Sequence, residues 1–353
     1  MSTSIKKTIL VAPLNWGLGH ATRCIPIIKA LLAHNYNVIL ASDGAALKLL
    51  KQEFPALPSV ILPSYNITYP KNGSLFTWHM VLKFPKLYTA VKREKKIIDQ
   101  LVEKGTINGI ISDNRLGVRN KNIPCVYITH QLRVPTGNTT LLSSKLHQKY
   151  IVKFDACWVP DYKKEPNLSG RLGHVNKLNK LVKHIGPLSR MTPKATRKSY
   201  DILAVLSGPE PQRTLLEEKL ISQLAHSNKK VALIQGVVED KQKWSSKGNL
   251  KILNYATTLE IEKLINESDL IISRSGYTTI MDLAALNKKA FLIPTPGQFE
   301  QEYLAKRLHD KQIVPSCSQD NFTLEQLALT NNFLSWPISE VNPQDFKELF
   351  SIF

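Results

Sequence analysis

A short loop near the start of the chain places two glycines and a histidine between an apolar run and a helix-like segment. The run TILVAP (8–13) precedes Gly17-Leu18-Gly19, and His20 opens the segment that follows. Glycines let a backbone turn tightly and approach a ligand, and a helix N-terminus favours negative charge. A neutral imidazole at a helix N-terminus also suits proton abstraction, because the helix dipole lowers its pKa. The loop therefore predicts a phosphate-binding turn, a general base, or only a tight turn with a solvent-facing histidine.

A second polar cluster follows another apolar run near residue 270. Ser275 and Gly276 end that run and a helix-like segment begins at once, which predicts a second helix N-terminus suited to an anion. Asp282 lies farther along the same segment, where its carboxylate can accept hydrogen bonds from a ribose diol. The amide and carboxyl groups downstream suit the hydroxyls of a sugar. The residues of this cluster are Ser275, Gly276, Tyr277, Thr278, Asp282, Gln298, Glu300 and Gln301.

Short apolar runs alternate with helix-like segments along almost the whole chain. One series runs from TILVAP to CWVP (157–160), and a second runs from YDILAVLSG (200–208) to KAFLIPTP (289–296). This alternation predicts parallel sheets covered on both faces, and two series predict two doubly wound α/β domains. The basic stretch 186–199 marks the junction. We therefore expect an N-terminal Rossmann-like domain over 1–188, a C-terminal one over 189–335, and a helical tail over 336–353.

The chain of 353 residues carries a formal net charge of +19. Such an excess favours an anionic partner: nucleic acid, an acidic membrane surface or a phosphorylated substrate. The four cysteines show no C-x-x-C spacing, which gives no sign of a zinc site or a disulfide framework. The sequence has no apolar signal segment and no apolar run long enough to span a bilayer. A cytoplasmic protein with at most peripheral membrane contact is expected.

The loop and the second cluster together resemble signatures of GT-B glycosyltransferases. The resemblance is to family 28, the family of the bacterial N-acetylglucosaminyltransferase that completes the lipid-linked peptidoglycan precursor. In that family the first domain opens with a Gly-x-Gly-His-type loop, matched here by Gly17, Gly19 and His20, and the donor domain carries an S-R-S-G strand end, matched by 273–276. The resemblance implies two Rossmann-like domains facing each other across a cleft. It implies transfer of a sugar, GlcNAc or another hexose, from a UDP-sugar to a hydroxyl acceptor.

The resemblance also implies roles for individual residues. Asp282 matches the acid on the nucleotide ribose, and Arg190 matches an arginine that reaches the diphosphate. Glu300 and Gln301 match a Gln pair that contacts the donor sugar and phosphates, and Glu300 departs from Gln, which leaves the donor sugar open. Further donor contacts are expected from Ser207, Gly208, Arg213, Tyr255, Ala256 and Arg274, and acceptor contacts from His130 and Gln131.

No D-x-D pair that would hold a divalent ion on a diphosphate occurs in the chain, so neither a metal nor another cofactor is expected. Helix N-termini and arginines would neutralise the charge on the leaving diphosphate. His20 would take the proton of the acceptor hydroxyl, with Asp113 either orienting the imidazole or acting as the base itself. The resemblance then implies inversion at the anomeric carbon in a single displacement.

Three other classes of function fit parts of the sequence. A UDP-sugar 2-epimerase shares the architecture but needs several carboxylates, in which the first domain is poor. A dinucleotide-dependent oxidoreductase would use Gly17, Gly19 and Asp43 and leaves the cluster at 273–305 without a role. A nucleic-acid binder would use the charge, yet no nucleic-acid motif is present. No nucleic-acid partner is therefore expected.

The segment 75–96 joins aromatic and aliphatic residues to a dense series of Lys and Arg. This composition fits a face lying on an acidic membrane leaflet, and it equally fits a solvated helix with its apolar side in the core. On the first interpretation Phe76, Trp78 and Phe84 are apolar anchors and the acceptor is a lipid-linked or cell-envelope glycan. The protein would then be peripheral on the inner face of the cell membrane.

Overall fold

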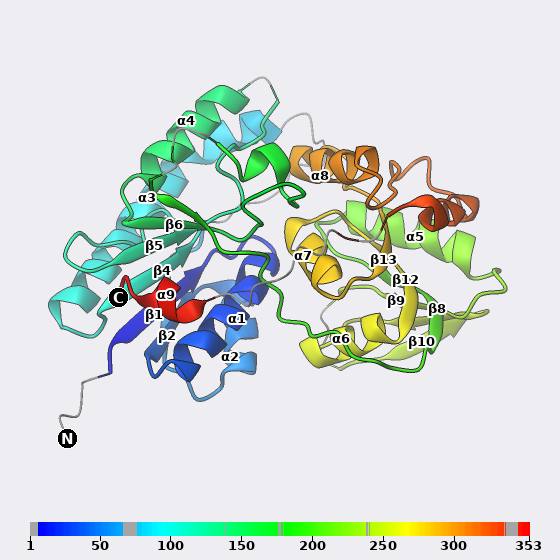
Figure 1. Cartoon of the computed structure of the whole chain (residues 1–353), viewed down its shortest axis with the longest axis horizontal. Coiled ribbons are helices and arrows are strands. Elements are labelled where there is room, and N and C mark those ends of the chain that lie inside the picture. The colour runs from blue at the N-terminus through cyan, green and yellow to red at the C-terminus, as the bar shows by residue number, and fades with distance from the viewer. Residues whose placement is uncertain are drawn as a thin grey trace. The chain divides into compact units, whose positions relative to one another are not determined.

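The structure is a computed structural model that describes residues 6–65, 76–137, 139–175, 178, 180–237, 239, 241–334, 336 and 345–353, with the backbone alone described over 76–84. The described residues fall into two compact units (Figure 1). Unit 1 holds those up to Arg190 together with 345–353, and unit 2 holds those from Met191 to Trp336. The helices that the structure describes include none with the length and hydropathy of a membrane span.

The described part of unit 1 is built on a seven-stranded parallel sheet in the order β3-β2-β1-β4-β5-β6-β7. Its central strands are apolar and buried, as expected for a parallel sheet flanked by helices. The strands are β1 (Thr8–Pro13), β2 (Asn37–Ser42), β3 (Ser59–Ile61), β4 (Gly109–Asp113), β5 (Cys125–Ile128), β6 (Ala156–Val159) and β7 (Val182–His184). The helices are α1 (Gly19–Ala33), α2 (Gly44–Glu53), α3 (Phe76–Glu103), α4 (Thr140–Ile151) and α9 (Phe346–Phe350), with a 3-10 turn at Gly170–Leu172.

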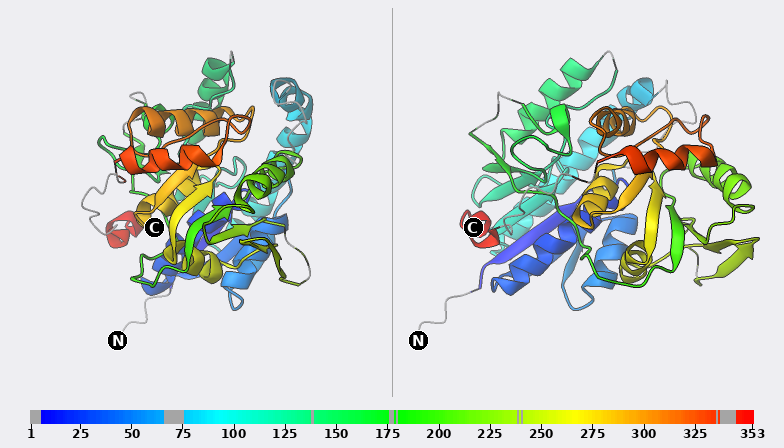
Figure 2. Two further views of the ribbon diagram at one scale, coloured as in Figure 1. Left: turned by 90° about the vertical axis from the view of Figure 1, so that its right-hand side faces the viewer. Right: turned by 45° about the vertical axis from the view of Figure 1, so that its right-hand side comes forward.

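Unit 2 holds a six-stranded sheet among its described residues, in the order β10-β11-β9-β8-β12-β13. Its strands are parallel except for the exposed edge strand β10, which pairs antiparallel with β11 (Figure 2). The strands are β8 (Tyr200–Val205), β9 (Val231–Ile234), β10 (Trp244–Lys247), β11 (Leu250–Leu253), β12 (Ser268–Ser273) and β13 (Lys289–Leu292). The helices are α5 (Gln212–Leu224), α6 (Thr258–Asn266), α7 (Tyr277–Ala285) and α8 (Phe299–Asp310), with a 3-10 segment at Leu324–Asn332. The prediction of a doubly wound α/β fold is confirmed.

Both sheets reverse their strand order between two neighbouring central strands. In unit 1 these are β1 and β4, and their register pairs Pro13 with Asp113 at the carboxyl ends. In unit 2 they are β8 and β12, whose register pairs Val205 with Ser273. Loops diverge to opposite faces at such a point, and the space between them is the usual ligand site of an open α/β sheet. Of the residues singled out from the sequence, the loops that follow these strands hold Gly17, Ser207, Gly208, Arg274, Ser275 and Gly276.

The C-terminal helix α9 belongs to unit 1. The ring of Phe350 lies edge-on to Tyr36 at 5.8 Å between centroids, and the ring of Phe353 lies 6.4 Å from that of Trp158. Gly109 opens β4 beneath Phe353, where a Cβ atom would stand 2.4 Å from the phenyl ring. The aromatic residues of the C-terminus therefore complete the core beside β1 and β4.

Candidate active site

His20 and Asp113 meet at the point where the strand order of unit 1 reverses. His20 stands in the first turn of α1, directly after the loop from β1, and Asp113 is the last residue of β4. The Nδ1 atom of His20 lies 2.8 Å from Oδ1 of Asp113. The Asp113 side chain is fully buried, whereas the His20 side chain is 13% exposed. Gly17 turns the loop with a φ of 76°, and nothing stands within 4 Å of where its Cβ would lie.

Arg23 holds the Asp113 carboxylate from one helical turn farther along α1. Its Nε donates to Oδ2 and its Nη2 donates to Oδ1, which forms a two-pronged ion pair. The Arg23 side chain is only 1% exposed, so both charges of the pair lie in the interior. Its Nη1 also donates to Nδ1 of His130, at 2.9 Å. Arg23 thus joins the end of β4 to the loop after β5.

The Nδ1 atom of His20 faces both an acceptor and a donor, so its role depends on the tautomer of the ring. Nδ1 lies close to the Asp113 carboxylate and 2.9 Å from Nη2 of Arg23. Arg23 can only donate, so Nδ1 accepts from it in one tautomer; in the other tautomer Nδ1 carries the hydrogen and donates it to the Asp113 carboxylate, which can only accept. Nε2 is then the basic nitrogen of the neutral ring. It has no hydrogen-bond partner among the residues that the structure describes.

Burial and charge set the protonation states of this pair. Burial lowers the pKa of His20 below its ordinary value and outweighs the neighbouring Asp113, which raises it. Burial alone would raise the pKa of Asp113, but the charges of Arg23 and His20 and their hydrogen bonds lower it to about 2. At neutral pH the site therefore holds an ionised carboxylate beside a neutral imidazole. Such an imidazole can accept a proton from a hydroxyl group.

Asp43, the acid that a dinucleotide site would need, is used inside the protein. Its Oδ1 pairs with the guanidinium of Arg115 and its Oδ2 accepts from the amide of Asn15 at 3.1 Å. Arg115 is fully buried and also binds Glu94 at 2.6 Å and the carbonyl of Pro13 at 2.9 Å. These bonds tie the ends of β1, β2 and β4 to α3. Asp43 is only 6% exposed and both its oxygens bind partners inside the protein, which argues against the oxidoreductase interpretation.

In unit 2 the loops after β8 and β12 bring backbone amides to the edge of the sheet. Gly208 lies after β8 with a φ of 108°, a conformation that other residues rarely adopt. Gly276 precedes the first residue of α7, and a Cβ there would meet only the hydroxyl of Thr279 at 4.0 Å. An open helix N-terminus attracts an anion. This geometry suits the predicted phosphate contacts of Gly208, Ser275 and Gly276.

The glutamines predicted to contact a sugar also hold their own loop in shape. The side chain of Gln301 accepts a hydrogen bond from the amide of Thr295 at 2.9 Å and donates to the side chain of Gln298 at 2.7 Å. The hydroxyl of Ser275 donates to the carbonyl of Gln301 at 2.8 Å. The segment before α8 is therefore fixed against the N-terminus of α7. Asp282 lies on α7 and is 8% exposed.

Two arginines predicted to contact the donor have other partners. The Arg274 side chain is 1% exposed, and its guanidinium donates to the carbonyls of Ile293, Pro294 and Gln212 and to the side chain of Gln319. It links the loop after β13 to the start of α5 and to Gln319 inside unit 2. Arg213 forms ion pairs with Glu210 and Glu217, both at 2.5 Å, which compensate its charge. The structure thus assigns both arginines to internal contacts.

The other predicted residues lie at the ends of elements. Tyr255 and Ala256 follow β11 directly before α6, and the Tyr255 amide is held by the side chain of Asn254 at 3.0 Å. Arg190 is the last residue of unit 1 and is partly buried. Ser207 is exposed. The remaining predicted residues are buried or half-buried: Ser275, Tyr277, Thr278, Glu300, His130 and Gln131. Among the described residues, no group of His, Cys, Asp and Glu side chains gathers in a way that could hold a metal ion.

The part played by Arg23 was not predicted. The sequence offers one indication of it, the three-residue spacing between His20 and Arg23. Residues three apart on a helix share a face, so both side chains can contact the same partner. Nothing in the sequence shows that this partner is Asp113, which lies 90 positions away.

The chain is similar to known glycosyltransferases. A model described as the glycosyltransferase family 28 C-terminal domain matches residues 209–331. An uncharacterized glycosyltransferase of Methanopyrus kandleri is 19% identical over 325 residues, which cover 87% of this chain and 91% of its own. The UDP-N-acetylglucosamine–N-acetylmuramyl-(pentapeptide) pyrophosphoryl-undecaprenol N-acetylglucosamine transferase of Streptococcus uberis is 21% identical over 335 residues, which cover 87% of each chain. The crystal structure of Acinetobacter baumannii MurG shares the fold, with a TM-score of 0.55 at 16% identity over 94% of this chain and 91% of that chain.

The protonation of His20 can be tested by titration. Its imidazole should titrate below the ordinary value of 6.5 because burial disfavours the charged ring. Asp113→Asn should lower the pKa of His20 further, because the carboxylate that favours the imidazolium is removed. Histidine ring NMR signals followed against pH give both values. Asp345→Asn, at the exposed N-cap of α9, is the control and should leave the His20 curve unchanged. A His20 pKa that rises in Asp113→Asn would contradict this electrostatic assignment.

Proposed function

The chain is a family 28-like glycosyltransferase of the GT-B fold that uses a nucleotide-sugar donor, and on this premise we propose that it transfers a hexose from a UDP-sugar to a hydroxyl group with inversion and without a metal ion. The observation that carries the proposal is the His20–Asp113 pair, a neutral imidazole whose orientation is fixed by a buried carboxylate. GlcNAc is the hexose proposed, because the Streptococcus uberis relative is named for transfer of N-acetylglucosamine.

His20 is proposed as the base that removes the proton from the acceptor hydroxyl. With the hydrogen on Nδ1, its Nε2 carries the lone pair that takes the proton, and its ring is the partly exposed member of the pair. Asp113 is proposed as the positioning residue, because it is fully buried and both its oxygens are bound by Arg23. The imidazolium that forms during transfer would be stabilised by the adjacent carboxylate. This assignment chooses between the two bases left open by the sequence.

The donor is proposed to bind at the carboxyl edge of the unit 2 sheet. The N-terminus of α7 at Gly276 would stabilise the negative charge that develops on the leaving diphosphate. Asp282 would accept hydrogen bonds from the ribose, and Gln298 and Gln301 would face the sugar while holding each other in place. Arg190 is proposed for the diphosphate because the resemblance gives it that role, whereas Arg213 and Arg274 bind partners inside unit 2.

A lipid-linked acceptor and peripheral membrane binding are proposed from two helices of unit 1. On α3 the side chains of Lys86, Lys92, Arg93 and Lys96 are exposed, whereas Leu75 and the side chains of Phe76, Trp78, Lys83 and Phe84 lie outside the described residues. On α4 the side chains of Leu141 and Leu142 are 72% and 70% exposed beside the exposed Lys145 and Lys149. No acidic residue occurs between 140 and 153. Exposed leucines among lysines suit an anionic lipid surface.

Replacing His20 tests the proposed base. His20→Ala should lower kcat by about 10²- to 10⁴-fold, because the acceptor hydroxyl loses its base, while the affinity for UDP changes little. Transfer to a hydroxyl acceptor is assayed with EDTA present, and UDP binding is measured by calorimetry. His34→Ala at the exposed end of the same helix is the control and should keep full activity. If UDP affinity falls as far as kcat, His20 binds phosphate and the proposed base is wrong.

Replacing Asp282 tests the donor site separately. Asp282→Ala should weaken UDP binding about 10- to 100-fold, the loss of one or two hydrogen bonds to a charged group. The matched control is Asp310→Ala, an exposed acid on α8 that pairs with Lys306. Calorimetry with UDP, GDP and TDP measures both the loss and the base preference. Unchanged UDP affinity in Asp282→Ala would remove this residue from the ribose.

Charge reversal on α3 tests the membrane proposal. Exchange of Lys86, Lys92, Arg93 and Lys96 to Glu should abolish binding to anionic vesicles at physiological salt, because each basic group near such a surface contributes about 1 kcal/mol. UDP binding should be retained, since these residues lie in unit 1. The control reverses four exposed lysines of unit 2, Lys241, Lys243, Lys247 and Lys251, and should keep vesicle binding. Absence of binding between wild-type protein and anionic vesicles at low salt would contradict the proposal.

A further inference from the structure

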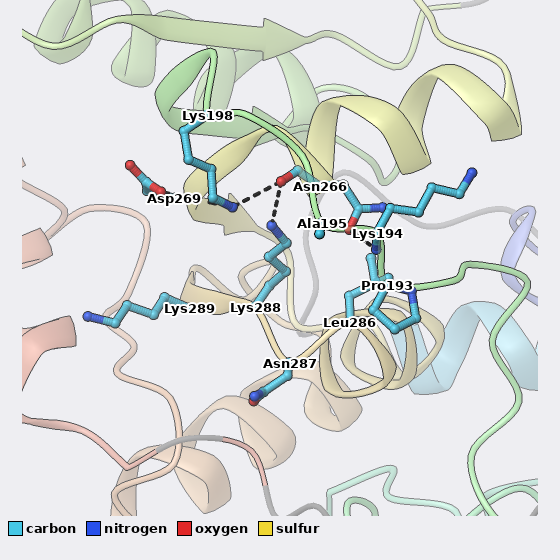
Figure 3. Close-up of a pocket in the computed structure, with 10 residues that line it drawn as sticks. All are labelled: Pro193, Lys194, Ala195, Lys198, Asn266, Asp269, Leu286, Asn287, Lys288 and Lys289. Carbon is cyan, nitrogen blue, oxygen red and sulfur yellow. Dashed lines mark hydrogen bonds and ion pairs between the residues drawn. The ribbon is translucent and has the colours of Figure 1, made fainter.

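An open cavity of about 550 Å³ lies in unit 2 at the edge of the sheet opposite the proposed donor site. It is bounded by the amino-terminal ends of β12 and β13, the end of α6 and the segment before β8. Four lysines line it, Lys194, Lys198, Lys288 and Lys289, with Asp269 as the acidic residue among the lining side chains (Figure 3). Neither the family match nor the proposed transfer reaction gives this cavity a role.

Two of the lysines bind the same pair of carbonyl oxygens. The Nζ of Lys198 donates to the carbonyls of Asn266 and Ser268 at 2.9 and 3.1 Å, and the Nζ of Lys288 donates to the same carbonyls at 2.8 and 3.1 Å. The two side chains reach Asn266 from different walls of the cavity, as Figure 3 shows. Two ammonium groups therefore share one small region at the end of α6.

One ammonium group would be enough to satisfy these carbonyls. The C-terminus of a helix favours a cation, and a single lysine there needs no further explanation. The second brings a like charge into a place where Lys288 is only 8% exposed. Burial, with the hydrogen bond and charge of Lys198, lowers the pKa of Lys288 to about 8. The pair therefore costs free energy unless a negative charge joins it.

The carboxylates around the cavity do not neutralise the positive charge of Lys198 and Lys288. Glu262 forms its ion pair with Lys194, at 2.5 Å. Asp269 lies 3.9 Å from Lys198 and is more than half exposed, so it screens that charge weakly. Lys288 and Lys289 have no carboxylate partner within the ranges that the structure describes. The side chain of Lys289 points away from the pair in Figure 3.

We propose that this cavity binds a phosphate group between Lys198 and Lys288. Each ammonium group has three hydrogens and uses two on the carbonyls, so each retains one donor for a ligand. A phosphate dianion supplies several acceptor oxygens and about two negative charges, which matches two neighbouring cations better than one carboxylate does. The site lies on the sheet edge away from Gly208 and Gly276, so it is separate from the proposed donor site and does not depend on the proposed function.

The fixed backbone supports a site of defined geometry. The side chain of Asn266 donates to the carbonyls of Thr192 and Glu262 at 3.1 and 3.0 Å, which holds the end of α6. The indole of Trp336 donates to the carbonyl of Lys288 at 2.6 Å. Both carbonyl acceptors and the buried lysine are thus held before any ligand binds.

Calorimetric titration of inorganic phosphate into UDP-saturated protein tests the proposal, because UDP blocks anion binding at the donor site. Saturable binding is expected, and Lys198→Gln should weaken it about tenfold or more, the loss of one charge-assisted hydrogen bond. Lys289→Gln is the matched control from the same cavity and should keep the wild-type affinity. Lys198 is 44% exposed, so its exchange leaves the buried Lys288 to hold α6.

A second readout follows the titration of Lys288 itself. Phosphate should raise the pKa of Lys288 from about 8, measured through its Cε–Hε NMR signals, because a bound anion stabilises the ammonium form. Glucose 1-phosphate in place of inorganic phosphate distinguishes a phosphate ester from the free ion, and retained binding of either supports the site. Absence of saturable phosphate binding, or equal loss in Lys198→Gln and Lys289→Gln, would overturn it. Failure of UDP to bind would overturn the donor proposal alone, because the phosphate titration can be run without UDP.

Discussion

The buried carboxylate of Asp113 is the constraint on which the site of unit 1 depends. A carboxylate without exposure is costly unless it is paired, and here Arg23 supplies the charge and His20 a further hydrogen bond. Both partners come from the start of α1, so the ion pair fixes how that helix leaves β1. The same bond orients the imidazole of His20. The stability of this edge and the proposed chemistry therefore rest on one interaction at the junction of β1 and β4.

Two other buried arginines hold the sheet edges from which the loops extend. Arg115 joins Asp43, Glu94 and the carbonyl of Pro13, so the ends of three strands and α3 keep their spacing. Arg274 performs the comparable task in unit 2 through the carbonyls of Ile293, Pro294 and Gln212. A guanidinium suits this task because its five hydrogens reach several acceptors in one plane. Arg115 and Arg274 thus hold strand ends and loops in place inside each unit.

The fold was largely predictable from the sequence, because buried parallel strands are continuous apolar runs of a few residues. The runs at 8–13 and 200–208 lie at β1 and β8, and the loops after them were placed correctly at strand ends. The short strand β7 and the exposed strand β10 were not predicted, since neither shows such a run. The resemblance to family 28 rested on local motifs, and the match of the family's C-terminal domain to residues 209–331 confirms it for that part of the chain.

The sequence by itself thus determined the alternation of strands and helices, the two glycine-bearing loops and the excess of positive charge. Only the tertiary structure decided which polar side chains bind one another. Arg23 and Asp113 are 90 positions apart, and Lys198 and Lys288 meet on the carbonyl of Asn266 from separate elements. The physical reason is that secondary structure follows short-range periodicity, whereas the partner of a charged side chain depends on strand order. Strand order brings distant residues together and leaves no local mark in the sequence.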